Sequence, residues 1–146
     1  MKNLKFRQAT DSDSEFAYQT KKVALREYVE KVWDWDEDTQ RQLHDRRYSS
    51  QEFQVVQLSG QDIGILVVVR EPACIKVNQL YILPEYQNRG IGEACMIHII
   101  QDAATYNLPV RLQVLKVNNR TKTFYQRLGF QITGQSETHI LMERTS

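Results

Sequence analysis

The sequence predicts an α+β fold built on a mixed β-sheet, and two observations support this class. Short apolar runs with the spacing of strands alternate with stretches in which apolar residues recur at helical spacing. In addition, a strand, a turn, a helix and another strand follow one another within residues 80–115, which is the size of a parallel βαβ crossover. Tight turns join other strands as hairpins, so the sheet is expected to be mixed.

The first predicted elements are a short strand and two helices. Residues 4–6 alternate apolar and charged side chains, as in a strand with one buried face. Residues 10–12 offer N-cap side chains, and apolar residues then recur at i, i+3, i+4 and i+7 in a helix that ends near Trp33. Acidic residues within 34–38 complement the positive end of a second helix, which is expected to reach Tyr48.

Three strands follow the helix pair. Residues 53–58 form the first strand, residues 59–62 have turn composition, and residues 63–69 form the second strand of a hairpin. Residues 74–82 continue as a third strand. Because residues 65–69 are an unbroken apolar run, the strand that contains them should lie in the middle of the sheet with both faces buried.

The next segment predicts the parallel crossover. Apolar residues after Gly90 have helical spacing, and residues 110–115 then form a strand. A right-handed crossover of this length makes neighbours of the strands around Leu80 and Leu112 and orients them roughly parallel.

The chain closes with a short helix and a hairpin. Asn118 is placed to cap a helix through Arg127, and Gly129 is placed to terminate it. Residues 130–133 and 140–142 have the composition of two strands of a last hairpin.

Composition excludes several classes of partner. The 146 residues are 41% hydrophobic and 25% charged, as in an ordinary globular protein. No linker or repeat interrupts them, so we expect one domain over residues 1–146. The 19 Lys and Arg residues nearly balance the 18 Asp and Glu residues. Without a basic stripe, no nucleic-acid partner is expected.

Membrane and metal binding are also not expected. The N-terminal residues lack the apolar region of a signal peptide, and no run of about 18 apolar residues occurs. These features predict a cytoplasmic protein without a membrane partner. The two cysteines and three histidines do not have the spacing of metal ligands, so no metal site is expected.

The segment most informative about chemistry is Gln87-Asn88-Arg89-Gly90-Ile91-Gly92, which follows a strand and opens a helix. Glycines at 90 and 92 allow a sharp turn in which successive N–H groups converge on one anion. The unpaired N–H groups of the helix start add to this preference for phosphate. The segment has neither the Lys-Ser/Thr of a Walker loop nor the third glycine of a dinucleotide motif.

This hexapeptide resembles the Gln/Arg-x-x-Gly-x-Gly signature of the GNAT superfamily of N-acetyltransferases. Leu80 through Tyr86 is similar to the family's strand and its Pro-Glu/Asp-aromatic approach, and Val117 through Phe130 resembles the family's second motif. One departure is Lys122, which stands where the family commonly has a small alanine. The chain thus resembles a small, single-domain, bacterial-type member of that superfamily.

The resemblance implies a fold and an activity. The implied GNAT fold has a mixed, mostly antiparallel central sheet of about six or seven strands with a splayed parallel pair, flanked by about four helices. The implied activity is transfer of the acetyl group of the cosubstrate acetyl-CoA to a primary amine, by direct attack in a ternary complex. The amine belongs to a small molecule or a peptide.

The resemblance also assigns residues to the cofactor. Backbone amides of the glycine loop would hold the CoA pyrophosphate, and backbone groups of the preceding strand would pair with the pantetheine as a further strand does. A backbone N–H there would also stabilise negative charge on the thioester oxygen. Asn118 matches an asparagine that contacts CoA. The implied cofactor-binding residues are Leu80, Tyr81, Ile82, Gln87, Asn88, Arg89, Gly90, Ile91, Gly92, Asn118 and Tyr125.

Two catalytic residues follow from the same comparison. Tyr125 is the predicted general acid, because a phenol with a pKa of about 10 stays protonated at neutral pH and supplies a proton to the departing thiolate. Spacing alone favours Tyr125 as a core residue of a short helix, and its position in the family motif favours a place near the CoA sulfur. The base is less well defined, because the strand at residues 75–81 contains no carboxylate. Glu27, Asp34 and a relayed water are the alternatives, and Glu27 is the predicted catalytic residue.

The acceptor pocket is expected in the first helix pair. Glu27, Tyr28, Trp33 and Trp35 lie there among several other carboxylates, and aromatic faces with carboxylates suit a cationic amine. The alternative is that both tryptophans close the core between the helices. Because Trp33 and Trp35 are two residues apart, at least one is expected in a turn.

Two functional alternatives remain open. A non-catalytic CoA-binding regulatory or interaction domain would share the phosphate loop without needing Tyr125 or an acceptor pocket. A regulator that contacts DNA directly is less well supported, since neither a basic patch nor a helix-turn-helix pattern is present. A homodimer formed through the last hairpin is possible by analogy with relatives.

Overall fold

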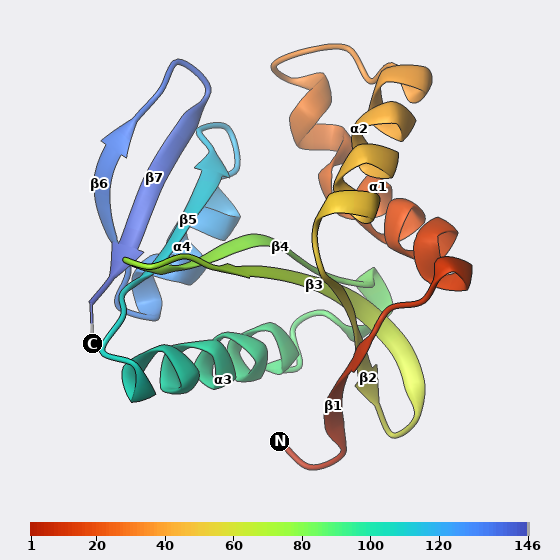
Figure 1. Ribbon diagram of the computed structural model, residues 1–146. Coiled ribbons are helices and arrows are strands. Elements are labelled where there is room, and N and C mark those ends of the chain that lie inside the picture. The colour runs from red at the N-terminus through yellow and green to blue at the C-terminus, as the bar shows by residue number, and fades with distance from the viewer. Residues whose placement is uncertain (146) are drawn as a thin grey trace.

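The computed structural model describes residues 1–145, and its seven strands form one sheet in the order β1-β2-β3-β4-β5-β7-β6 (Figure 1). Every pair of neighbouring strands is antiparallel except β4 and β5, which are parallel. In chain order the elements are β1 (Leu4–Gln8), α1 (Ser14–Glu30), α2 (Glu37–Ser50), β2 (Phe53–Leu58), β3 (Gln61–Arg70), β4 (Ile75–Ile82), α3 (Ile91–Thr105), β5 (Val110–Leu115), α4 (Asn119–Arg127), β6 (Gln131–Gln135) and β7 (His139–Arg144). The predicted α+β class and the order of its elements are confirmed.

The local signals in the sequence act as expected at most element ends. The Asp36 side chain caps α2 by accepting from the Asp38 N–H at 3.1 Å, and the Asn118 side chain caps α4. The turn between β2 and β3 is shorter than predicted. Ser59 and Gly60 alone form it, both with positive φ, because such a two-residue turn matches the twist of the flanking strands.

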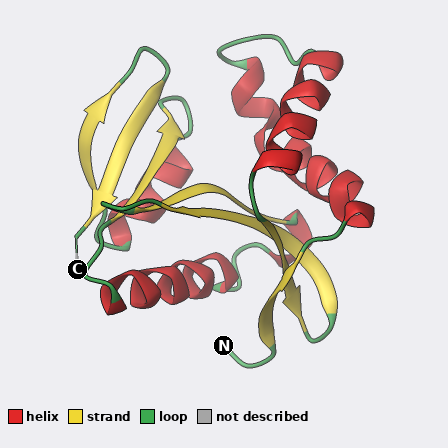
Figure 2. Cartoon of the chain, viewed as in Figure 1, coloured by secondary structure: helices red, strands yellow, loops and turns green. Residues whose placement is uncertain are grey.

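The sheet is covered on both faces. Helix α3 packs with α4 residues on one face, in a core that includes Ile91, Met96 and Tyr125. Helices α1 and α2 lie over the opposite face of the sheet, where a smaller core includes Ala17 and Phe53 (Figure 2). As predicted, β3 lies in the middle of the sheet. Its residues 63–67 are buried, whereas Val68 and Val69 are partly exposed.

The parallel pair is splayed. Pairing of β4 with β5 runs from Ile75↔Val110 to Val77↔Leu112 and then stops, although both strands continue. Leu112 therefore pairs with Val77, and Leu80 lies beyond the last pair. Beyond this point β5 remains paired with β7, and β4 remains paired with β3. The two halves of the sheet diverge, and the facing edges of β4 and β5 are left open.

Within residues 1–145, no helix combines the length and the apolarity that crossing a membrane requires.

Candidate active site

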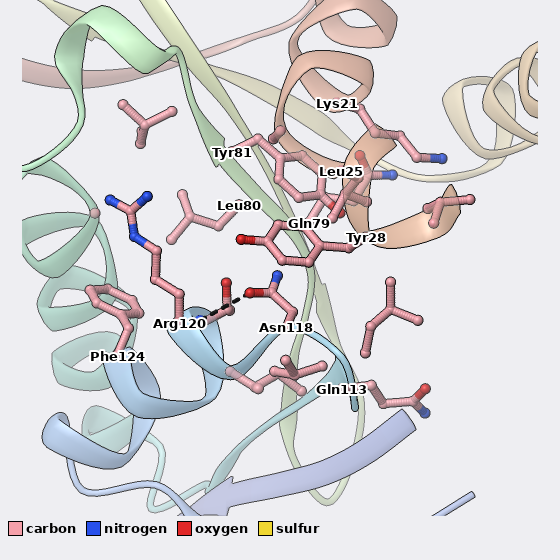
Figure 3. Close-up of a pocket in the computed structure, with 18 of the residues that line it drawn as sticks. Lys21, Leu25, Tyr28, Gln79, Leu80, Tyr81, Gln113, Asn118, Arg120 and Phe124 are labelled. Atoms are coloured by element: carbon pink, nitrogen blue, oxygen red, sulfur yellow. Dashed lines mark hydrogen bonds between the residues drawn. The ribbon is translucent and has the colours of Figure 1, made fainter. Parts of the chain in front are cut away.

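A cleft of about 1570 Å³ follows the splayed ends of β4 and β5. Helices α1 and α2 border it on one side, and the start of α3 and the start of α4 border it on the other. The side chains that line it come from segments far apart in the chain: Lys21 and Tyr28 from α1, Gln79 through Tyr81 from β4, and Asn118, Arg120 and Phe124 around α4 (Figure 3). We call the α3–α4 side the donor half and the α1–α2 side the acceptor half.

The open edge of β4 presents backbone groups to the cleft. The N–H of Leu83 donates to the carbonyl of Ile63 at 2.8 Å, so residue 83 faces β3. Because successive strand residues direct these groups to opposite edges, the N–H and C=O of Ile82 and Leu80 face away from β3, toward the gap beside β5. The side-chain amide of Gln87 donates to the Ile82 carbonyl at 2.9 Å, which agrees with this orientation.

The side chain of Tyr81 points to the opposite face of the sheet from those of Leu80 and Ile82. Its side chain packs with Ile65 and Val67 on the α1–α2 face, and burial raises the pKa of its hydroxyl well above the ordinary value. Its hydroxyl is therefore protonated at neutral pH.

The glycine loop turns sharply before α3. Asn88 and Gly90 have φ of 62° and 77°, and Gly90 is the N-cap of the helix. Within residues 1–145 no side chain caps α3, so the first N–H groups of the helix stay available to an anion. Gln87, Asn88 and residues 90–92 line the cleft, whereas Arg89 does not and lies with its guanidinium 5.4 Å from the Tyr86 ring centroid.

Helix α4 faces this loop across the donor half. Asn118 is buried, lines the cleft and accepts from the Thr121 N–H at 3.1 Å. Arg120 donates to Asn88 Oδ1 at 3.0 Å, so a guanidinium lies beside the loop. Arg120 is not among the site residues predicted from the sequence, since charged helix residues are ordinarily solvated. Its position two residues after the capping asparagine was the available signal.

Tyr125 belongs to the core and to the cleft at once. Its ring packs edge-on against Phe124 and Phe130, with centroid distances of 5.0 and 5.4 Å. The residue is only 7% exposed, yet it lines the cleft. Burial raises the pKa of its hydroxyl, which keeps the proton on the oxygen at neutral pH. The two interpretations of Tyr125 from the sequence are thus compatible.

The predicted acceptor residues separate into two groups. Glu27, Tyr28 and Trp33 line the cleft, and the Trp33 ring lies 6.5 Å from the ring of His139 in β7. Trp35 is not among the described residues that line it, and its indole N–H donates to Glu37 at 3.0 Å. Both tryptophans lie in the connection between α1 and α2, outside the helices.

Much of the acidic charge of the helix pair is used in structural contacts. Glu30 pairs with Arg26 at 2.7 Å, and Glu37 pairs with Lys22 at 2.9 Å. Asp36 caps α2. The carboxylate of Glu27 is exposed and borders the cleft.

The acceptor half holds polar groups that the sequence interpretation missed. Lys21 is 4% exposed, and burial together with the nearby Arg47 lowers the pKa of its ammonium to about 8. Gln79 is 5% exposed, and its Oε1 has no hydrogen-bond partner among residues 1–145. The available signal for Lys21 was its helical spacing with the small residues Ala17 and Ala24, which places it on the buried face of α1.

Solved structures share this fold over nearly the whole chain. A PaiA N-acetyltransferase from Thermoplasma acidophilum in complex with coenzyme A is 16% identical with a TM-score of 0.79, covering 98% of this chain and 99% of that one. A GNAT family acetyltransferase from Elizabethkingia anophelis with acetyl-CoA bound is 16% identical with a TM-score of 0.74, covering 100% of each chain. The ribosomal-protein-S18-alanine N-acetyltransferase from Escherichia coli is 15% identical with a TM-score of 0.71, covering 97% and 93%.

These likenesses show the fold, and a family model adds the family. No curated protein matches the sequence. The model described as Acetyltransferase (GNAT) domain matches residues 49–132, which is more than half of the chain and contains both halves of the parallel pair. The glycine loop, the open edge of β4 and the start of α4 all lie within that match. The protein is therefore a member of the GNAT acetyltransferase family.

Proposed function

We propose that the protein transfers the acetyl group of acetyl-CoA to a primary amine by direct attack in a ternary complex. One observation carries this proposal: a single cleft is lined by the open edge of β4, the start of α3, Tyr125 and the residues of α1 and α2. At the start of α3 no side chain caps the helix among residues 1–145. Two solved relatives of the same fold hold coenzyme A or acetyl-CoA.

The donor half supplies groups that suit each part of acetyl-CoA. N–H groups of residues 87–92 bind the pyrophosphate, and Arg120 adds a positive charge beside them. Backbone groups of Leu80 and Ile82 pair with the pantetheine amides, in the way that an added strand pairs with a sheet edge. A free N–H on this edge donates to the thioester oxygen as it gains negative charge, a contribution of about 3 kcal/mol in comparable sites.

The transfer needs one proton donor and one proton acceptor. The amine nitrogen forms a bond to the acetyl carbon, the bond from that carbon to sulfur breaks, and the thiolate leaves with a proton from Tyr125. Burial keeps the Tyr125 hydroxyl protonated at neutral pH, so it carries a proton that it can donate. The proton of the attacking amine passes to Glu27, either directly or through water. Strand β4 contributes no carboxylate to the cleft, and the amides of Gln79 and Asn78, which line it, cannot act as a base.

The acceptor amine binds in the α1–α2 half, beside Tyr28 and Trp33. Their aromatic rings line the cleft and suit an amine of a small molecule or of a peptide. Trp35 does not line the cleft but supports the α1–α2 connection that carries Trp33, through its hydrogen bond to Glu37. A homodimer through the last hairpin stays a prediction; Ile132 and Leu141 of that hairpin are 48% and 36% exposed.

Calorimetry with acetyl-CoA tests the donor half of this proposal. We expect saturable binding with a dissociation constant below the millimolar range, and desulfo-CoA, which keeps the phosphates and the pantetheine amides, should bind comparably. Absence of heat change at millimolar acetyl-CoA, with folded protein, would overturn the assignment.

A further inference from the structure

Two cations of the acceptor half, Lys21 and Arg47, have no ion-pair partner among residues 1–145, although carboxylates such as Glu27 also line this half. Lys21 extends from α1 and is almost completely buried, and Arg47 of α2 lines the same cleft. Eight ion pairs occur elsewhere in that part of the chain. Lysine is almost never fully buried without a partner, because the ammonium loses its hydration.

The surroundings of Lys21 make its burial more unfavourable. The charged group that acts on Lys21 is Arg47, which is another cation, and their repulsion adds to the desolvation of the ammonium. Neighbouring Lys22 differs in this respect, because it pairs with Glu37 at 2.9 Å. A buried cation beside a second cation in a cleft is a site that an anion stabilises.

A second buried polar group lies across the cleft on β4. Gln79 directs its side chain to the α1–α2 face, as Tyr81 does two residues later, and its Oε1 is an acceptor without a donor among the described residues. Lys21, Gln79 and Tyr81 border the same hollow (Figure 3). An unsatisfied buried acceptor is uncommon in a folded protein, and a ligand N–H would satisfy it.

We propose that the acceptor amine carries a carboxylate, which Lys21 and Arg47 bind while Gln79 Oε1 accepts a hydrogen bond from the amine. This inference rests on the acetyl transfer proposed above and names its substrate class as amino acids and related amino carboxylates. The donor half already has its own phosphate-binding groups in the uncapped start of α3 and Arg120. Lys21 and Arg47 therefore serve a different anion.

The test uses matched pairs of amines that differ by the carboxylate. Acetyl-CoA-dependent thiol release is measured for leucine and isoamylamine, for phenylalanine and phenethylamine, and for β-alanine and ethylamine. The corresponding amino acid amides keep the size of each substrate without its negative charge. We expect kcat/KM for at least one amino acid to exceed that of its matched amine and amide by about tenfold or more, as for a charge-assisted contact.

Variants of Lys21 and Arg47 test whether these two cations cause the preference. Lys21→Met keeps the length of the side chain and should reduce the carboxylate preference to about twofold or less by raising KM, whereas Lys21→Arg should keep part of it. Arg47→Gln should lower the preference partially. The matched controls Lys22→Met and Arg46→Gln, which lie next to these residues and outside the cleft lining, should leave it unchanged.

Each result decides a separate claim. Acetylation of amines without any preference for the carboxylate, or a preference that survives in Lys21→Met, would overturn this inference and leave the acetyl transfer intact. Thiol release with none of the amines, from protein that binds acetyl-CoA, would overturn the proposed transfer itself and the inference with it.

Discussion

The donor half and the acceptor half of the cleft are built from different kinds of sequence. The donor half uses two contiguous segments, residues 80–92 and 118–125, and offers mainly backbone groups. The acceptor half brings together Lys21, Arg47 and Gln79 from three elements, and offers side chains, of which those of Lys21 and Gln79 are buried. Backbone groups suit a donor that is the same in every reaction, whereas side chains can be changed one at a time to select an acceptor.

The largest effect is expected where the two halves meet, at Tyr125. Tyr125→Phe keeps the ring packed against Phe124 and Phe130 but removes the proton donor. We expect kcat to fall by about 100-fold or more, as for loss of a general acid, with little change in acetyl-CoA affinity. Steady-state kinetics over a pH series together with calorimetry measure both quantities. Turnover unchanged at every pH would remove Tyr125 from the mechanism.

Gly64 of β3 controls the shape of the open edge. A Cβ at this position would lie 2.4 Å from the carbonyl oxygen of Tyr81 and 2.8 Å from the Ile82 side chain, so β4 would have to shift. Gly64→Ala should cost about 2–3 kcal/mol in the free energy of unfolding and weaken acetyl-CoA binding as well. Gly134→Ala is the control, since its Cβ would meet no atom within 4 Å. Equal behaviour of the two variants in denaturation and calorimetry would contradict this role.

The buried ammonium of the acceptor half gives a pH-dependent signature. The pKa of Lys21 is about 8 in the folded protein against 10.5 for the free group, so the unfolded chain binds more protons between these values. The stability contributed by this residue therefore rises with pH from about 8 to about 10.5. Lys21→Met should increase the free energy of unfolding at pH 7 by about 2 kcal/mol, and this gain should vanish near pH 10.5.

The difference between wild type and variant is the quantity to measure, because other groups titrate in the same range. Burial raises the pKa of Cys95 to about 12, and that thiol lowers stability as the pH rises above the ordinary thiol value. Cys95 contributes equally to both proteins and cancels. A difference that stays constant from pH 7 to pH 10.5 would mean that the Lys21 ammonium is not destabilised by burial.

The smallest effect separates backbone strain from ligand binding in the donor half. Gly90 and Gly60 both have positive φ, 77° and 82°, and a Cβ would meet no atom within 4 Å at Gly60 and only the end of the Met1 side chain, at 4.0 Å, at Gly90. Each alanine variant should lose about 1 kcal/mol of stability. Gly90→Ala should in addition weaken acetyl-CoA binding by about tenfold, since it alters the N–H groups at the start of α3. Equal affinities of the two variants in calorimetry would place the phosphate site elsewhere.

The contrast between contiguous and dispersed segments also explains which features the sequence predicts and which it does not. The cap at Asn118 and the turn at Gly90 depend on a few neighbouring residues, so their positions and their place in the cleft follow from local rules. The end of pairing at Val77 does not, because it depends on how β5 pairs with β7 and how β4 pairs with β3. The strands around Leu80 and Leu112 are parallel neighbours as predicted, but no local rule indicates that their pairing ends at Val77.

The acceptor half shows the same limit more strongly. The carboxylates between Glu27 and Asp38 indicated a cationic acceptor; Asp36 and Glu37 are engaged in a helix cap and in ion pairs, whereas Glu27 lines the cleft. The buried charged residue of the cleft is Lys21, a single lysine within an amphipathic helix rather than part of a charged run. Burial of one lysine is set by the packing of α1 on the sheet, so it becomes visible only in three dimensions.

The most direct test of the account is acceptor-dependent release of the CoA thiol, measured with purified protein, acetyl-CoA and the amine pairs, and checked by the mass of the acetylated product. The account predicts that thiol and N-acetylated amine form in equal amounts, only when an amine is present. Tight binding of acetyl-CoA without acetylated product from any amine would contradict it, and would favour a non-catalytic CoA-binding domain.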